Sequence, residues 1–112
     1  MENELRKKEY YGQLLLIYGN LLTKNIHHRM ELFYLNDYSI TEISQNEEVS
    51  RNAVFESLAN GEKQLDKYEK SLKLFERNQR ILSIIERMES EEDKEKLKEE
   101  IRKLKGEIGY GI

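Results

Sequence analysis

The apolar residues of this chain recur at intervals of three and four, the period of an amphipathic α-helix. One such stripe predicts a first helix and consists of Tyr11, Leu14, Leu15, Tyr18, Leu21 and Leu22. We expect this helix to end near Thr23, whose hydroxyl can cap a second helix. The stripe of the second helix consists of Ile26, Met30, Phe33 and Tyr34.

Two cap signals divide the middle of the chain. After a predicted turn over residues 36–38, Ser39 and Glu42 have the spacing of a capping box, which opens a short helix that reaches about Asn46. Ser50 is a second cap and opens a fourth helix, with an inward stripe of Val54, Leu58, Gly61 and Leu65. Two helices so close must meet at a sharp angle, which predicts a helix-turn-helix. Its elbow is expected to bury Ile43, Val49 and Val54 beside the small Ser44.

Beyond Leu65 the fourth helix either continues or bends near Asp66. The apolar positions go on as Tyr68, Leu72, Phe75, Leu82, Ile85 and Met88. Ser90 and Asp93 are expected to cap a last, charged helix with an apolar stripe of Leu97, Ile101 and Leu104. We therefore predict an all-α fold in one domain of residues 1–112, with a helix-turn-helix core over residues 10–65 and a helical extension over residues 66–112.

Composition supports the helical class and narrows the function. The 112 residues include no proline and six glycines, which argues against a turn-rich β fold. No cysteine is present, which excludes disulfides, thiolate catalysis and cysteine-ligated zinc. The 19 basic and 22 acidic residues give a net charge of −3, a poor starting point for binding nucleic acid. Because no long apolar run is present, we expect a cytoplasmic protein with no membrane insertion.

Several segments between Tyr18 and Leu72 carry a wider likeness. They are "YGNLLT", "ELFYLNDYSITEI" and "VSRNAVFESL", followed by "LDKYEKSL". These segments resemble the bacterial YlxM-like family, small helical proteins similar to the promoter-reading carboxy-terminal region of sigma factors. The resemblance implies a sigma-like helix-turn-helix and a link to the signal recognition particle pathway, because the genes of the family lie beside those of the particle's GTPase and its receptor. It implies no catalytic residues.

The sequence also departs from the family pattern. Glu48 stands at the turn position that usually carries glycine, and Phe55 stands where tyrosine is usual. Ala59, Asn60 and Gly61 replace basic residues that commonly follow in the fourth helix. These departures weaken the expectation of DNA binding and leave the expected fold unchanged.

A fourth helix that entered a major groove would face DNA with Arg51, Asn52, Glu56, Asn60 and Lys63. An arginine there can pair with guanine or phosphate, and an asparagine with adenine. Glu56 lies in the middle of this face and would repel phosphates. Use of the helix-turn-helix as a protein scaffold is therefore the favoured interpretation, with duplex DNA as the alternative partner.

Catalytic and metal chemistry find little support in the sequence. His27 and His28 point about 100° apart on a helix, so they cannot share one ion. Either of them with Glu31 supplies two ligands, whereas zinc takes three or four. The serines at the predicted caps need no catalytic explanation, and no glycine-rich phosphate loop or nucleophile elbow is present. We expect no enzyme activity, no metal and no cofactor.

One apolar stripe exceeds what the predicted domain can cover. Its residues, Tyr68, Leu72, Phe75, Leu82 and Ile85, are the expected interface of a homodimer. The expected function is that of a non-catalytic regulatory or accessory protein of the signal recognition particle pathway, with the particle's GTPase, its receptor or the particle RNA as partner. A DNA-binding transcriptional regulator is the alternative.

Overall fold

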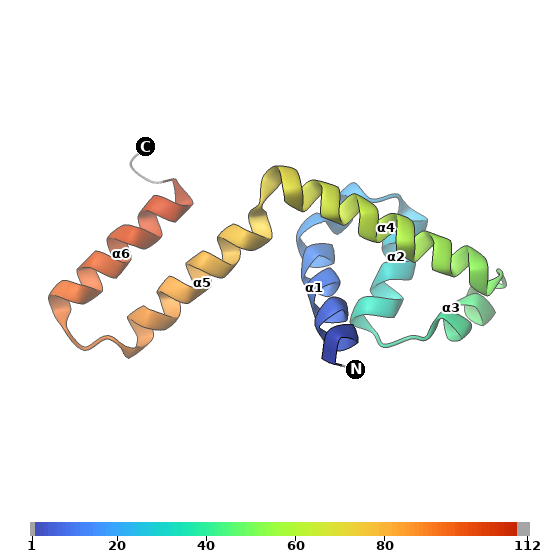
Figure 1. Ribbon diagram of the computed structural model, residues 1–112, viewed down its shortest axis with the longest axis horizontal. Helices are drawn as coiled ribbons and strands as arrows, with labels where there is room; N and C mark the ends of the chain where they lie inside the picture. Colours follow the sequence, from blue (N-terminus) through green and yellow to red (C-terminus); the bar gives the residue numbers. More distant parts are fainter. Residues whose placement is uncertain (1, 110–112) are drawn as a thin grey trace. The chain divides into compact units, whose positions relative to one another are not determined.

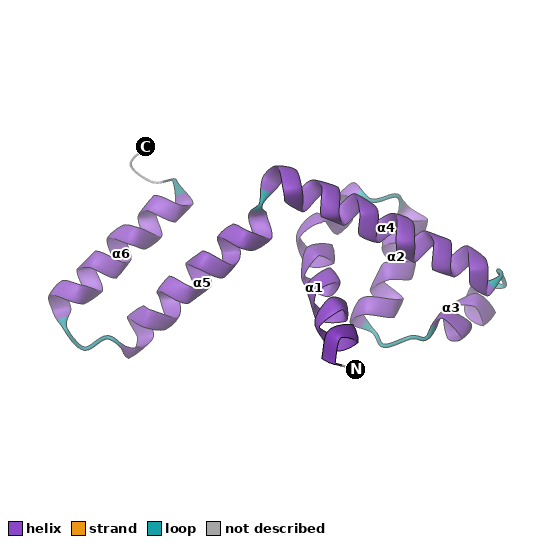
Figure 2. Cartoon of the chain, in the orientation of Figure 1, coloured by secondary structure: helices purple, strands orange, loops and turns teal. Residues whose placement is uncertain are grey.

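The computed structural model describes residues 2–109 of the chain. Within this range every regular element is helical (Figures 1 and 2), which confirms the predicted all-α class. The elements are α1 (Glu2–Tyr18), η1 (Gly19–Leu21), α2 (Lys24–Met30), η2 (Glu31–Leu35), α3 (Ile40–Glu47), α4 (Arg51–Leu72), α5 (Leu74–Ser90) and α6 (Lys94–Ile108). They form two compact units that divide between Leu72 and Lys73, and each unit is described by itself.

The core of the amino-terminal unit is built from the predicted stripes. Its buried apolar side chains are Leu14, Leu15, Tyr18, Leu22, Met30, Tyr34, Ile43, Val54, Leu58 and Leu65. Full burial of a large apolar side chain stabilises a fold by about 1.5–3 kcal/mol, so these residues dominate the energetics of the unit. The expectation for Leu21 is wrong, since this side chain is 54% exposed. The chain tightens at Gly19 into the 3₁₀ turn η1, which includes Leu21, and the change of period moves this residue off the stripe.

The helix caps follow the sequence signals at the helix-turn-helix. The Ser39 hydroxyl accepts a hydrogen bond from the Glu42 amide, and the Glu42 carboxylate accepts one from the Ser39 amide, each at 3.0 Å. The Ser50 hydroxyl accepts from the Ala53 amide at 3.0 Å. Both predicted caps of α3 and α4 are therefore confirmed.

Two other cap predictions are wrong in detail. Thr23 occupies the cap position of α2, but its side chain forms no cap hydrogen bond. Ser90 is the last residue of α5, where its hydroxyl donates to the carbonyls of Glu86 and Arg87, as is common for serine inside a helix. Asp93 alone caps α6, through the amides of Glu95 and Lys96.

Helix α4 passes Asp66 without the bend that was one of the two expectations. It continues to Leu72, and the helical path breaks at Lys73, whose backbone is left-handed with φ 52° and ψ 35°. A residue in this conformation cannot continue a right-handed helix. The apolar stripe that continues past Leu65 is therefore divided between α4 and a separate helix, α5. The expected last helix, α6, follows through residues 91–93.

The carboxy-terminal unit is an antiparallel helical hairpin (Figure 1). Ile84 is its buried apolar side chain among the residues described. One side of the hairpin is closed by two ion pairs between α5 and α6, Arg80 with Glu107 at 3.0 Å and Arg87 with Glu100 at 3.1 Å. The two pairs are spaced seven residues apart on each helix, which suits the antiparallel register.

A glycine lets α4 approach α2 closely. A Cβ atom added at Gly61 would collide with the Met30 sulfur and lie 3.0 Å from the Ile26 Cγ2 atom. Met30 is fully buried, so it has little room to move. Gly61 therefore provides the space that the α2–α4 contact requires.

We predict that Gly61→Leu lowers the free energy of unfolding by about 1–3 kcal/mol, the usual effect of overpacking a core. Gly106→Leu is the matched control, because a Cβ atom at this position in α6 meets nothing within 4 Å. That variant should gain up to about 1 kcal/mol from helix propensity. Urea unfolding followed by circular dichroism measures both. Equal effects of the two substitutions would contradict the role given to Gly61.

Candidate functional site

The helix-turn-helix elbow joins α3 to α4 through a tight turn. Ile43 and Val54 are fully buried and Ser44 is nearly so, as predicted, while Val49 is only half-buried. Glu48 adopts a left-handed backbone with φ 55°, the conformation that glycine tolerates best. The sequence therefore makes this turn at a cost in backbone strain of about 1–2 kcal/mol.

An arginine that the sequence did not single out ties three helices together at the elbow. The Arg29 Nε atom of α2 donates to both carboxylate oxygens of Glu47 in α3, each at 3.2 Å. Its Nη1 atom donates to the Ser57 hydroxyl of α4 at 2.7 Å. The guanidinium and the carboxylate are mostly buried, so the pair is screened little by solvent. It fixes the angle of the helix-turn-helix.

Three tyrosines hold the acidic side of α4 against the rest of the unit. Each phenol donates a hydrogen bond to a carboxylate of α4, and the pairs are Tyr11 with Asp66 at 2.9 Å, Tyr18 with Glu69 at 2.7 Å, and Tyr34 with Glu62. The spacing 62, 66 and 69 puts the carboxylates on one side of a helix. Burial and the carboxylate Glu62 raise the pKa of Tyr34 far above its ordinary value.

The outward side of α4 carries a single row of polar side chains. Its members share one helical face and are Asn52, Glu56, Asn60, Lys63, Lys67 and Lys70, all exposed. The row spans about 27 Å at 1.5 Å per residue. Its three lysines form no ion pair with any residue between 2 and 109, so this end of the row is basic.

Four of the five predicted DNA-facing residues lie on this row, and Arg51 does not. Arg51 is exposed, but it precedes Asn52 and so points about 100° away from it. The Asn52 amide donates to Glu56 at 3.3 Å, and the Asn60 amide oxygen accepts from Gln64 at 3.3 Å. Both amides that were candidates for reading bases are thus engaged within the helix.

Lys67 and Lys70 were missed by the sequence analysis. A net charge averages over all sides of a helix, and the four acidic residues of α4 cancel its four basic ones. The signal that would have found them is the spacing of Lys63, Lys67 and Lys70, which repeats at four and three residues.

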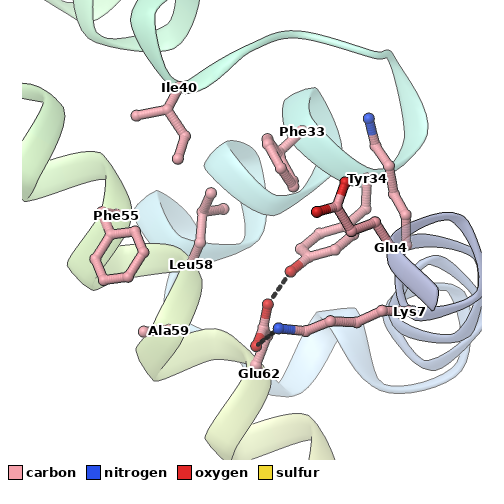
Figure 3. A pocket seen from close by; sticks show the side chains of 10 residues that line it. Glu4, Lys7, Phe33, Tyr34, Ile40, Phe55, Leu58, Ala59 and Glu62 are labelled. Atoms are coloured by element: carbon pink, nitrogen blue, oxygen red, sulfur yellow. Dashed lines mark hydrogen bonds and ion pairs between the residues drawn. The ribbon is translucent and has the colours of Figure 1, made fainter. Parts of the chain in front are cut away.

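An apolar groove of about 410 Å³ lies beside the elbow (Figure 3). Phe33, Ile40, Phe55, Leu58 and Ala59 form its apolar lining. The other lining residues are Glu4, Lys7, Lys8, Tyr34 and Glu62. Glu62 accepts from Tyr34 and pairs with Lys7 at 3.6 Å, as the dashed lines in Figure 3 show. Phe55 is 59% exposed, so the groove opens to solvent at an aromatic ring.

The predicted dimer residues are placed in different surroundings. In the amino-terminal unit Tyr68 is half-buried against the Tyr18 ring, with its hydroxyl 3.4 Å from the Leu21 carbonyl, and Leu72 is exposed. In the carboxy-terminal unit Phe75 is half-buried, while Leu82 and Ile85 are exposed.

The two histidines of α2 do not share a site. The His27 Nε2 atom lies 3.8 Å from a Glu31 carboxylate oxygen, and His28 is exposed. Among residues 2–109, no three histidine, aspartate or glutamate side chains lie close enough together to hold one metal ion. In the same range, no helix is long and apolar enough to cross a lipid bilayer.

Comparison with known proteins agrees with this geometry. Residues 5–105 match the family described as "Putative helix-turn-helix protein, YlxM / p13 like", also named UPF0122. The chain belongs to this family. The helix-turn-helix of residues 40–72 lies wholly inside the matched range.

Individual UPF0122 proteins share about two fifths of their residues with the matched part of this chain. The protein from Exiguobacterium sp. is 40% identical over 65 residues, which cover 58% of this chain and 61% of the relative. The protein from Staphylococcus haemolyticus is 38% identical over 68 residues, 61% of this chain and 62% of the relative. The protein from Streptococcus suis is 38% identical over 66 residues, 59% and 58% respectively. The matches thus span about three fifths of each relative.

We predict that Tyr34→Phe lowers the free energy of unfolding by about 1.5–3 kcal/mol at neutral pH, because a hydrogen bond to a charged group is lost. The folded chain keeps the Tyr34 proton above the ordinary tyrosine pKa of 10.0. Above that pH it binds more protons than the unfolded chain, so stability should fall as pH rises. This alkaline loss should be smaller in the variant.

Tyr38→Phe is the control for this measurement. The Tyr38 side chain is exposed, and its hydroxyl forms no hydrogen bond with the described residues. Chemical unfolding at neutral pH and at alkaline pH compares the two variants with the unchanged chain. Equal behaviour of the Tyr34 and Tyr38 variants would show that the bond to Glu62 contributes nothing.

Proposed function

We propose that this chain is a non-catalytic accessory protein of the signal recognition particle pathway that binds a protein component through the groove beside its helix-turn-helix. The observation that carries the proposal is the exposed aromatic ring of Phe55 at the mouth of an apolar groove. Exposed aromatic residues that line a cleft are typical anchors for a partner side chain. The pathway itself follows from the family resemblance of the sequence and implies a cytoplasmic site of action.

The charges around the groove support a protein partner over a nucleic acid. At its rim Lys7 is paired with Glu62, and Lys8 is paired with Asp37 at 3.4 Å while its ammonium lies 4.8 Å from the Phe33 ring centre. Both lysines are thus neutralised by carboxylates, which leaves little charge to attract a phosphate backbone. An apolar side chain flanked by polar groups fits this lining.

Binding to purified components tests the proposal. The chain is passed over immobilised particle GTPase, its receptor and the particle RNA, with and without nuclease. We expect nuclease-resistant binding to the GTPase or its receptor. We expect Phe55→Glu to weaken it at least about tenfold, which corresponds to about 1.4 kcal/mol.

Leu16→Glu is the matched control, because Leu16 is also an exposed apolar residue of the amino-terminal unit, 68% accessible, and lies outside the groove. It should bind as the unchanged chain does. Binding that nuclease abolishes, or that survives Phe55→Glu, contradicts a protein partner in the groove.

A second candidate function, a DNA-binding transcriptional regulator, is favoured by one observation. The lysine end of the outer α4 row, Lys63, Lys67 and Lys70, is exposed and unpaired within the described residues. Lysines at this spacing suit contacts to successive phosphates. Glu56 and the engaged amides of Asn52 and Asn60 weigh against base recognition on the same row.

We therefore predict weak, sequence-independent binding to duplex DNA, with a Kd of about 10⁻⁴–10⁻⁶ M at physiological salt. Replacing the three lysines by alanine should reduce the slope of log K against log salt by up to about 2.7, since each phosphate contact contributes about 0.9. Lys96→Ala with Lys103→Ala, on the outward side of α6, is the control and should leave the slope unchanged. Sub-micromolar binding to one sequence would favour the regulator instead.

A further inference from the structure

Helix α5 carries more apolar surface than α6 covers. Its residues Ile81, Ile84 and Met88 share the side that packs on α6, and of these only Ile84 is buried. Ile85 and Leu82 point about a fifth and about a third of a turn away from that side, on average about a quarter of a turn, and they are 38% and 47% exposed. In a four-helix bundle each helix touches two neighbours at about this angular separation. Helix α5 therefore has one neighbour in place and room for another.

The two sides of the hairpin differ in charge. One side is closed by the ion pairs of Arg80 and Arg87 with α6. Leu82 and Ile85 lie on the opposite, open side. On that side Glu86 and Glu89 flank them on α5, and neither forms an ion pair with the described residues.

The α6 half of the same open side is basic. Lys98 and Arg102 lie there, four residues apart and exposed. Lys98 approaches only Glu95, one turn away, at 3.7 Å, and both side chains are largely in solvent. The open side thus has an acidic half on α5, a basic half on α6 and an apolar strip at Leu82 and Ile85.

We propose that this open side binds the same side of a second copy of the chain, which completes a four-helix bundle. A two-fold axis along the helices sets the acidic half of each copy opposite the basic half of the other. It also makes every helix antiparallel to both of its neighbours, the arrangement of up-and-down bundles. The patch is complementary to itself, as an isologous interface requires, and this favours a second copy over a foreign partner.

Light scattering on the full chain at micromolar concentration tests the dimer. The expected mass is twice 13.4 kDa, and Leu82→Glu with Ile85→Glu should return it to the single-chain value. Leu16→Glu, on an exposed leucine of the other unit, is the matched control and should stay dimeric. Circular dichroism shows whether each variant remains helical. A monomeric unchanged chain overturns the proposal.

A charge exchange tests the pairing itself and uses exposed residues, so that folding is not at risk. One chain carries Glu86→Lys and Glu89→Lys, and a second carries Lys98→Glu and Arg102→Glu. Each alone should be monomeric at concentrations where the unchanged chain is dimeric, because its two halves repel those of its copy. Mixed, the two chains should form a heterodimer. The proposal is overturned if either variant alone dimerises as well as the unchanged chain. It is also overturned if mixing the two variants yields no heterodimer, since any dimer would then form through another surface.

Discussion

The rotation of α4 about its own axis is set by three hydrogen bonds from tyrosines to carboxylates. Tyr11, Tyr18 and Tyr34 reach Asp66, Glu69 and Glu62 from α1 and η2. Each bond joins a neutral donor to a charged acceptor, which makes it stronger than a bond between neutral groups. The buried stripe of α4 alone would tolerate a modest turn of the helix, but three directional bonds on one flank do not. Together with the buried stripe, these bonds determine which side of α4 is exposed.

This arrangement separates the charges of α4 by side. Acids at 62, 66 and 69 face the tyrosines, and lysines at 63, 67 and 70 face outward. A helix whose segment sums to almost no charge thereby presents a basic outer surface at one end. Both candidate functions depend on this separation of charges. The alternative DNA-binding role uses the outward lysines, and the favoured protein-binding role uses the groove beside the elbow, which Glu62 helps to line. A single carboxylate thus contributes both to the fold and to the candidate site.

The two compact units are stabilised by different interactions. The amino-terminal unit has a core of fully buried side chains drawn from four helices, together with the Arg29 contacts at its elbow. The carboxy-terminal hairpin has ion pairs along one side and little buried apolar surface among its described residues. Two helices alone bury too little to be stable without further contacts, so the hairpin is the part of the chain that gains most from an additional partner.

The sequence by itself determined the features that depend on neighbours along the chain. The capping box of Ser39 and Glu42, the cap at Ser50 and the buried stripe of Val54, Leu58 and Leu65 all arise from spacings of three or four residues. The family resemblance rested on the same local segments, and the matched family confirms it.

Only the tertiary structure decided the exposure of Leu21, the break at Lys73 and the partners of the α4 carboxylates. The tyrosine of one pair lies 55 positions from its carboxylate and that of another 51 positions, so no periodicity along the chain could connect them. The spacing of Lys63, Lys67 and Lys70 is visible in the sequence. Only the tertiary structure shows that these lysines have no ion-pair partner among residues 2–109, because such partners can come from distant parts of the chain.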